Sequence, residues 1–341
     1  MTKNRLKWIS GAKFVAILAV VVVHCNGIMY TNNYIAMATS FSVTLFILLS
    51  GIGTYISYKN NPDRPISVSL IKVFPLIKSY AIATVILYFL YRRQFIFSDL
   101  IRHLLSFDIE GTFYFVFFFL QLKFISPFLI RWYGFCDSKK EKYLLHIISL
   151  VISFVLSVVF IKYTYILPLY GGGKYLLGGS YFFVYYLGIL IGPFTEIDIS
   201  AKQKLMLLTI SIPLWVLWSL GIATYRLPFD IWLRPLLGAG DNPPSFNYIV
   251  FAILTLFVCY SLFSFIDASE NKVIRKLMSI IVFLGDNTLE IFLYHFAIMT
   301  LVIEFFPQIK DNVWLCRCGL FPLMVFLMPT IKYILKMKTD K

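Results

Sequence analysis

The first apolar stretch of the chain, WISGAKFVAILAVVVVHCNGI at residues 8–28, sets the pattern for the whole sequence. It matches the roughly 20 residues that an α-helix needs to cross the hydrocarbon core of a bilayer. A basic start with Lys3, Arg5 and Lys7 precedes it, but no small-residue cleavage site of the kind that ends a secretory signal follows. We therefore expect a retained membrane helix rather than a removed leader.

Apolar windows of similar length recur along the chain. The 341 residues are 59% hydrophobic and only 14% charged, with a mean hydropathy of +0.79, whereas soluble domains carry roughly 25% charged residues. We predict an all-α, polytopic integral membrane bundle of about ten transmembrane helices, with residues 1–341 forming a single membrane-embedded domain and no appended soluble domain. The predicted spans are 8–28, 34–57, 68–91, 111–130, 143–162, 176–194, 203–222, 247–266, 278–304 and 313–335.

The cations indicate an orientation. The formal net charge of +14 is divided into short runs between apolar stretches, which argues against a nucleic-acid partner and is typical of a membrane protein that follows the positive-inside rule. Ten crossings would place both termini on one side, and the basic ends of the chain assign that side to the cytoplasm. An outer segment at 223–246 mixes aromatic, basic and turn-forming residues, and it suits either a substrate entrance or an interfacial connector. The five cysteines have no CxxC or zinc spacing, so no metal site is expected.

A few ionisable residues lie inside the predicted spans, where charge is costly and usually functional. Lys13 and His24 are eleven residues apart, which places them on one helix face about 16 Å apart. His295 lies at a similar depth in the predicted ninth span, and Glu290 lies on the same span one turn beyond Asp286. A neutral imidazole suits the role of general base, because its pKa is near the working pH. For His24 alone, a structural hydrogen bond to a neighbouring helix is an equally good interpretation.

The remaining ionisable residues carry weaker predictions. His103 and His146 lie beside loops, so we expect surface or interfacial positions for both. Lys123 lies in the predicted fourth span, where pairing with Glu290 or another acid would offset its charge.

Several segments resemble, in order and spacing, the acyltransferase-3 family of bacterial membrane O-acyltransferases, and the resemblance covers nearly the whole chain. The first-helix pattern of that family, in which Arg precedes a catalytic His by eleven positions, is similar to GAKFVAILAVVVVH at 11–24. Departures are Lys13 and Lys72 in place of arginines and Tyr114 in the approximate place of Trp. Further similar segments are LFILLSG at 45–51, LIKVFP at 70–75, FYF at 113–115, YFFVYYLG at 181–188 and GDNTLEIFLYH at 285–295.

The resemblance implies transfer of an acyl group, most often acetyl, from cytoplasmic acyl-CoA to a hydroxyl of an envelope or exported polysaccharide, in the bacterial cytoplasmic membrane. No bound cofactor is expected, since acetyl-CoA or another acyl-CoA is the donor substrate; the expected partners are this donor, a glycan acceptor and membrane lipid. His24 would act as the general base or form an acyl-imidazole, with His295 or Glu290 orienting it or receiving a proton. The expected donor-binding residues are Lys13, Lys72 and Lys78, and the expected acceptor or oxyanion contacts are Ser50, Tyr114 and Tyr294.

Two other classes of function stay open at the level of sequence. Buried His, Lys and Glu also form transport paths, so a transporter or flippase for a glycan or small polar substrate is the main alternative. A noncatalytic assembly subunit of a polysaccharide system is the third. The identity of the acceptor, the choice between acetyl and succinyl, and the oligomeric state do not follow from the sequence.

Overall fold

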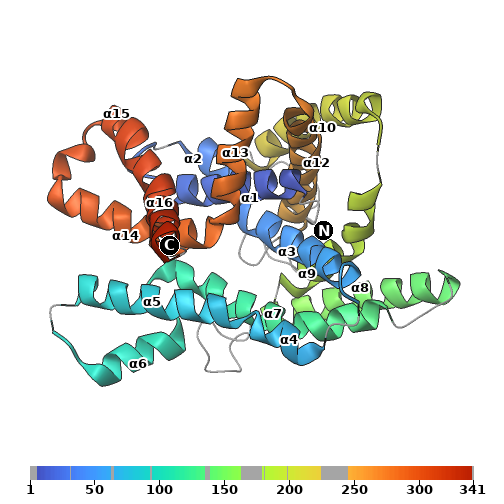
Figure 1. The fold of residues 1–341 in the computed structure, drawn as a ribbon, viewed down its shortest axis with the longest axis horizontal. Coiled ribbons are helices and arrows are strands. Elements are labelled where there is room, and N and C mark those ends of the chain that lie inside the picture. The colour runs from blue at the N-terminus through green and yellow to red at the C-terminus, as the bar shows by residue number, and fades with distance from the viewer. Residues whose placement is uncertain are drawn as a thin grey trace. The chain divides into compact units, whose positions relative to one another are not determined.

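The computed structural model of the chain is built almost entirely of helices (Figure 1). It describes residues 6–30, 32–62, 65–92, 94–134, 139–162, 179, 181–197, 199–223 and 245–339. Within these ranges no strand occurs and nine helices are long and apolar enough to cross a membrane, so the predicted all-α, polytopic fold is confirmed. Their bounds are Lys7–His24, Tyr34–Lys59, Phe74–Tyr91, Gly111–Tyr133, Glu141–Phe160, Ala201–Ile222, Phe246–Ala268, Thr288–Phe305 and Val313–Met337.

The chain forms two compact units. The first comprises Met1–Phe46, Ile199–Pro228 and Asn247–Lys341, and the second comprises Ile47–Asp198 and Phe229–Phe246. Most of the predicted outer segment at 223–246 lies outside the described residues, as does Cys136.

The first unit is organised around the N-terminal helix. Its helices are α1 (Lys7–His24), α2 (Asn33–Ala38), α10 (Ala201–Ala223), α12 (Phe246–Ala268), α13 (Lys272–Asp286), α14 (Thr288–Phe305), α15 (Val313–Leu315) and α16 (Phe321–Thr339), with a π-helical segment at Cys316–Leu320. Gly285 of α13 lies so close to α1 that an added Cβ atom would be 1.9 Å from the carbonyl oxygen of Ser10. Close packing of small residues is a usual way for membrane helices to associate. It fixes α13 on α1, and α14 also packs against α1 and α16.

Two helices of the second unit are in close backbone contact. It contains α3 (Ser42–Lys59) from Ile47 onward, α4 (Ile66–Ile71), α5 (Phe74–Tyr91), α6 (Phe97–Ser106), η1 (Gly111–Phe113), α7 (Tyr114–Tyr133), α8 (Lys139–Lys162), α9 (Phe182–Ile191) and η3 (Gly192–Glu196). An added Cβ atom on Gly51 would be 2.2 Å from the carbonyl oxygen of Tyr185, and one on Gly188 would be 2.2 Å from that of Leu48. The backbones of α3 and α9 therefore touch directly.

Further contacts show that α3 and α9 run in the same direction. Gly51 meets Gly188 near the middle of α3, and Tyr55 packs on Gly192 one turn later. Lys59 at the end of α3 forms an ion pair with Glu196 at the end of η3. Phe182–Glu196 is shorter than the nine long helices, and it occupies the place of the predicted span 176–194, whose beginning lies partly outside the described residues.

Two predicted spans are broken by turns that hydropathy does not show. The span predicted at 68–91 consists of α4, a turn at Lys72 and Val73, and α5, whose first turn carries Pro75. The span predicted at 278–304 is interrupted at Asn287, where α13 ends and α14 begins. The prediction that Asp286 and Glu290 lie one turn apart on one helix is therefore wrong.

Between α5 and α7, the short helix α6 buries a histidine for which the sequence predicts a surface or interfacial position. A surface position for His103 is wrong, because its side chain is 5% exposed and its Nδ1 atom lies 2.5 Å from a carboxylate oxygen of Asp108. Arg102 bonds to Asp99 and Asp108 at 3.1 and 3.0 Å. Burial alone would raise the pKa of Asp108, but hydrogen bonds from Ser106 and His103 and the charge of Arg102 outweigh burial and lower it. This cluster fixes α6 to the loop that follows it.

Candidate active site

Two histidines from different helices meet in the first unit. Nδ1 of His24, the last residue of α1, lies 2.6 Å from Nε2 of His295 in α14. The ring planes differ by only 10° and the ring centroids are 4.9 Å apart. Nearly coplanar rings whose closest atoms are nitrogens have the geometry of an in-plane N–H···N hydrogen bond. His295 is fully buried and His24 is half-buried.

The backbone of α14 decides which nitrogen of each ring carries hydrogen. Nδ1 of His295 lies 2.8 Å from the carbonyl oxygen of Phe292 and 3.1 Å from that of Ile291. Carbonyl oxygens only accept, so this nitrogen is the donor, and in the neutral ring Nε2 is left as an acceptor. Nδ1 of His24 must then donate to it. In neutral His24 the lone pair on Nε2 is consequently free, and among the described residues no side chain or backbone group is bonded to that atom.

The two acids that the sequence places before His295, Glu290 and Asp286, have partners of their own. Glu290 pairs with Lys332 of α16, which replaces the Lys123 partner considered from the sequence. Ser10 of α1 donates to Asp286 at 2.8 Å. Tyr294, next to His295 in the chain, is half-buried. The structure thus joins the two predicted histidines and gives Glu290 a cation of its own.

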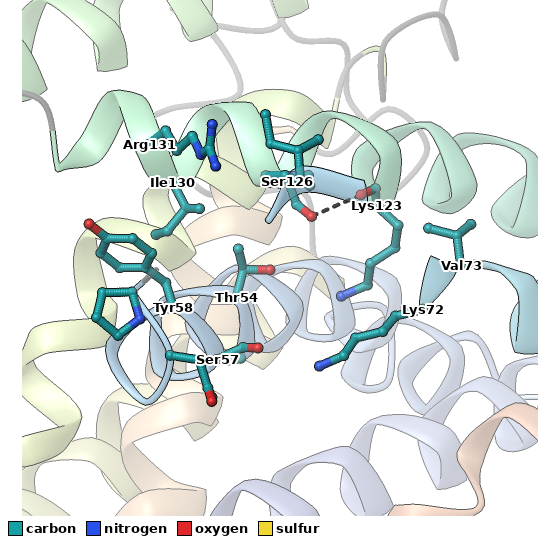
Figure 2. A pocket seen from close by; sticks show the side chains of 14 residues that line it. Thr54, Ser57, Tyr58, Lys72, Val73, Lys123, Ser126, Ile130 and Arg131 are labelled. Carbon is teal, nitrogen blue, oxygen red and sulfur yellow. Dashed lines mark hydrogen bonds between the residues drawn. The ribbon is translucent and has the colours of Figure 1, made fainter. Parts of the chain in front are cut away.

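A cavity of about 210 Å³ lies in the second unit. Lys72 from the turn between α4 and α5 meets Lys123 and Arg131 of α7 there, facing Thr54 and Ser57 of α3. Figure 2 shows the amino groups of both lysines directed to the same side of the cavity. The described residues that line it include three cations and no carboxylate. The full lining is Gly53, Thr54, Ser57, Tyr58, Asn61, Pro62, Ile66, Lys72, Val73, Lys123, Ser126, Pro127, Ile130 and Arg131.

The structure does not place all predicted donor-binding residues together. Lys72 lines this cavity, whereas Lys78 is exposed on α5 and is not part of the lining. Lys13 is half-buried on α1, in the first unit. Sequence reasoning missed Arg131 because it looks like an ordinary cytoplasmic anchor at the end of a span. Lys123 was a candidate from the sequence, but the turn before α5 that brings Lys72 beside it could not be predicted.

The predicted acceptor contacts are also divided. Ser50 and Tyr114 belong to the second unit, on α3 and at the start of α7. The hydroxyl of Ser50 is buried and has no hydrogen-bond partner within the described part of the chain. Tyr294 belongs to the first unit, beside the histidine pair.

Metal chemistry has no obvious ligand set in the described ranges. No group of three or more His, Cys, Asp or Glu side chains that could hold an ion occurs there. The candidate reactive group of the first unit is the imidazole of His24 with its free lone pair.

Comparison with known families identifies the class of protein. A family model described as an acyltransferase domain, that of the acyltransferase-3 family, matches residues 6–333. The chain belongs to the acyltransferase-3 family and is a multi-pass membrane acyltransferase that acts on a hydroxyl-bearing acceptor. No curated protein and no solved structure gives a significant match.

Proposed function

We propose that this acyltransferase moves an acyl group, most simply acetyl, from acyl-CoA to a sugar hydroxyl of a cell-envelope or exported polysaccharide, with His24 as general base. The observation that carries the proposal is the hydrogen-bond chain from the carbonyl oxygens of Ile291 and Phe292 through His295 to His24. It leaves the Nε2 lone pair of His24 free to take a proton.

The reaction follows from that protonation state. Nε2 of His24 accepts the hydroxyl proton as the acceptor oxygen attacks the thioester carbonyl carbon. The new C–O bond forms, the C–S bond breaks, and the thiolate of CoA leaves with the proton that His24 had taken. His295 stays the acceptor for Nδ1–H of His24, while its own N–H points at two carbonyl oxygens that stabilise positive charge on the imidazole pair.

The cation-lined cavity of the second unit supports CoA as the donor. CoA is a polyanion, and Lys72, Lys123 and Arg131 present three positive groups around this cavity. Arg131 offers the planar fork that suits phosphate, and the two lysines act as point charges. In the proposed orientation the cavity opens to the cytoplasm, because it lies where α3 and α7 end and α5 begins, and acyl-CoA is cytoplasmic.

The proposal is tested by assaying acetyl transfer from labelled acetyl-CoA to envelope glycan in proteoliposomes. His24→Ala is expected to lower the rate roughly 100-fold or more, because general-base catalysis contributes factors of about 10²–10⁴. His146→Gln is the matched control, since it removes an imidazole of the second unit that stacks on Tyr133 and lies outside the pair. A transporter or an assembly subunit would give no glycan labelling with any variant, and wild-type labelling by His24→Ala would refute the role of this residue.

His295 is expected to behave as a positioning residue in the same assay. His295→Gln keeps an oxygen that can accept from Nδ1–H of His24, whereas His295→Ala does not. We expect Gln to retain clearly more activity than Ala at equal amounts of folded protein. Equal activity of the two variants would contradict the orienting role while leaving His24 as the base.

A further inference from the structure

A second cavity lies where the two helices that carry the histidine pair end. It has a volume of about 670 Å³ and belongs wholly to the first unit. Its lining comes from the two segments that continue the histidine-bearing helices: the turn after α1, and the last turns of α14 with the loop that follows. The lining residues are Gly27, Ile28, Met299, Thr300, Ile303, Glu304, Pro307 and Lys310.

The spacing along both helices places this cavity next to the catalytic imidazole. Gly27 is three residues after His24, and Met299 is one turn after His295 on α14, a rise of about 6 Å. We propose that this cavity is the acceptor site, and that it binds an uncharged sugar whose hydroxyl is presented to Nε2 of His24. The proposal rests on the proposed function and names the substrate class for it.

The polar groups of the cavity suit a neutral polyol. Glu304 supplies two acceptor oxygens, Lys310 supplies donors, and Thr300 can do both. In the part of the chain that the structure describes, neither Glu304 nor Lys310 has a side-chain hydrogen bond or ion pair, so both remain available to a ligand. Ile28, Met299, Ile303 and Pro307 provide apolar surface for the C–H faces of a sugar ring.

The two cavities differ in charge, as a polyanionic donor and an uncharged acceptor would require. The cavity of the second unit is lined by three cations and, in its described lining, by no acid, which fits a polyanionic donor. The second cavity carries one carboxylate and one ammonium group, so its formal charges cancel. A strongly anionic ligand gains little there, whereas sugar hydroxyls can bond to both groups.

Two local features border the cavity. Glu304 lies in the last turn of α14, where the partial negative charge of the helix end disfavours a carboxylate. Gly27 has φ of +83°, which residues with a Cβ atom rarely adopt, and a Cβ atom built on it meets nothing within 4 Å. The turn it permits is closed by Gly27 N–H donating to the Tyr30 carbonyl at 2.8 Å, and no side chain from Gly27 enters the cavity.

The test measures KM for the acceptor separately from KM for the donor. The probe is the glycan fraction extracted from cells that lack the protein, offered at rising concentration with saturating acetyl-CoA. We expect Glu304→Gln to raise KM for this glycan about ten-fold and leave KM for acetyl-CoA unchanged. Thr300→Trp should have the same selectivity because its indole ring takes up part of the cavity.

Asp311→Asn is the matched control, since it removes one negative charge from the exposed loop that follows α14, at a residue that does not line the cavity. Its KM for glycan is expected to equal that of the wild type. The acceptor site is refuted if Glu304→Gln and Thr300→Trp keep the wild-type KM for glycan, or if Asp311→Asn weakens glycan binding as much as Glu304→Gln. The proposed function is tested separately: it is refuted if the His24→Ala variant is active, whatever the KM for glycan of the cavity variants.

Discussion

A single backbone feature determines the chemistry of the histidine pair. His295 is buried with one ring nitrogen held against two carbonyl oxygens of its own helix, so its tautomer is fixed before any substrate binds. Through one hydrogen bond of 2.6 Å, the tautomer of His295 fixes the tautomer of His24. The free lone pair of His24 is thus a consequence of the carbonyl groups at Ile291 and Phe292, one turn earlier on α14.

At the cation-lined cavity, charge rather than shape is expected to decide donor affinity. Lys123→Gln and Lys72→Gln should each raise KM for acetyl-CoA roughly ten-fold, because a hydrogen bond to a charged group contributes about 1.5–3 kcal/mol and about 1.4 kcal/mol corresponds to a factor of ten. KM for the glycan should stay constant. The measurement is initial rate against acetyl-CoA concentration at fixed ionic strength.

Lys78→Gln distinguishes the donor-binding set predicted from the sequence, which includes Lys78, from the set that lines the cavity, which does not. Lys78 lies near Lys72 in the chain but does not line the cavity, so its replacement should leave KM for acetyl-CoA unchanged. A rise in KM with Lys78→Gln as large as that with Lys123→Gln would show that general positive charge, and not this cavity, attracts the donor.

At the scale of helices, hydropathy predicted where membrane segments lie and failed where they break. Long apolar runs carry enough signal to locate nine of the ten predicted spans as long helices in the described residues. The break at Lys72 went unseen because apolar residues continue on both sides of it. The break at Asn287 went unseen because a window of about 20 residues averages over the short polar run at 285–288. Pro75 and the GDN sequence at 285–287 were the available signals, since Pro favours the first turn of a helix and Asn favours its start.

The candidate site could be predicted only in part, for a related reason. The depth argument brought His24 and His295 together, although it counted His295 along a helix that actually begins at Thr288. Partners that depend on packing between distant segments could not be seen. Lys332 reaches Glu290 from a helix that starts 31 residues later, counting from Glu290 to Phe321, and hydropathy gives no information about which helices are neighbours.

The glycines that pack α3 against α9 are expected to be essential for stability. Gly51→Ala places a Cβ atom 2.2 Å from a backbone carbonyl oxygen, so the two helices must separate; overpacking of this kind costs about 1–3 kcal/mol. Gly53→Ala on the same helix is the control, because its Cβ atom meets nothing within 4 Å and alanine favours helix by about 1 kcal/mol. Thermal unfolding in detergent should show a lower midpoint for Gly51→Ala alone, and equal midpoints for the two variants would contradict the contact.

At the scale of the whole molecule, the short apolar segment Phe182–Glu196 decides whether the two termini lie on the same side of the membrane. Nine long helices in the described residues would place the two termini on opposite sides, whereas a crossing by this segment makes ten and places them on the same side. Its parallel contact with α3, ending in the pair of Lys59 with Glu196, supports a crossing. In an alternating path, α3 and the sixth crossing both run inward.

We therefore expect both termini of the full chain to lie in the cytoplasm. A fluorescent protein that matures only in the cytoplasm should be bright when fused to the C-terminus, and alkaline phosphatase, which is active only outside, should be inactive there. Phosphatase inserted at Gln94, in the exposed connection between α5 and α6, is the external control and should be active. A phosphatase-active C-terminus would mean that Phe182–Glu196 does not cross the membrane. The cation-rich beginning of α10 and the cation-rich end of α16 would then lie outside, against the positive-inside rule.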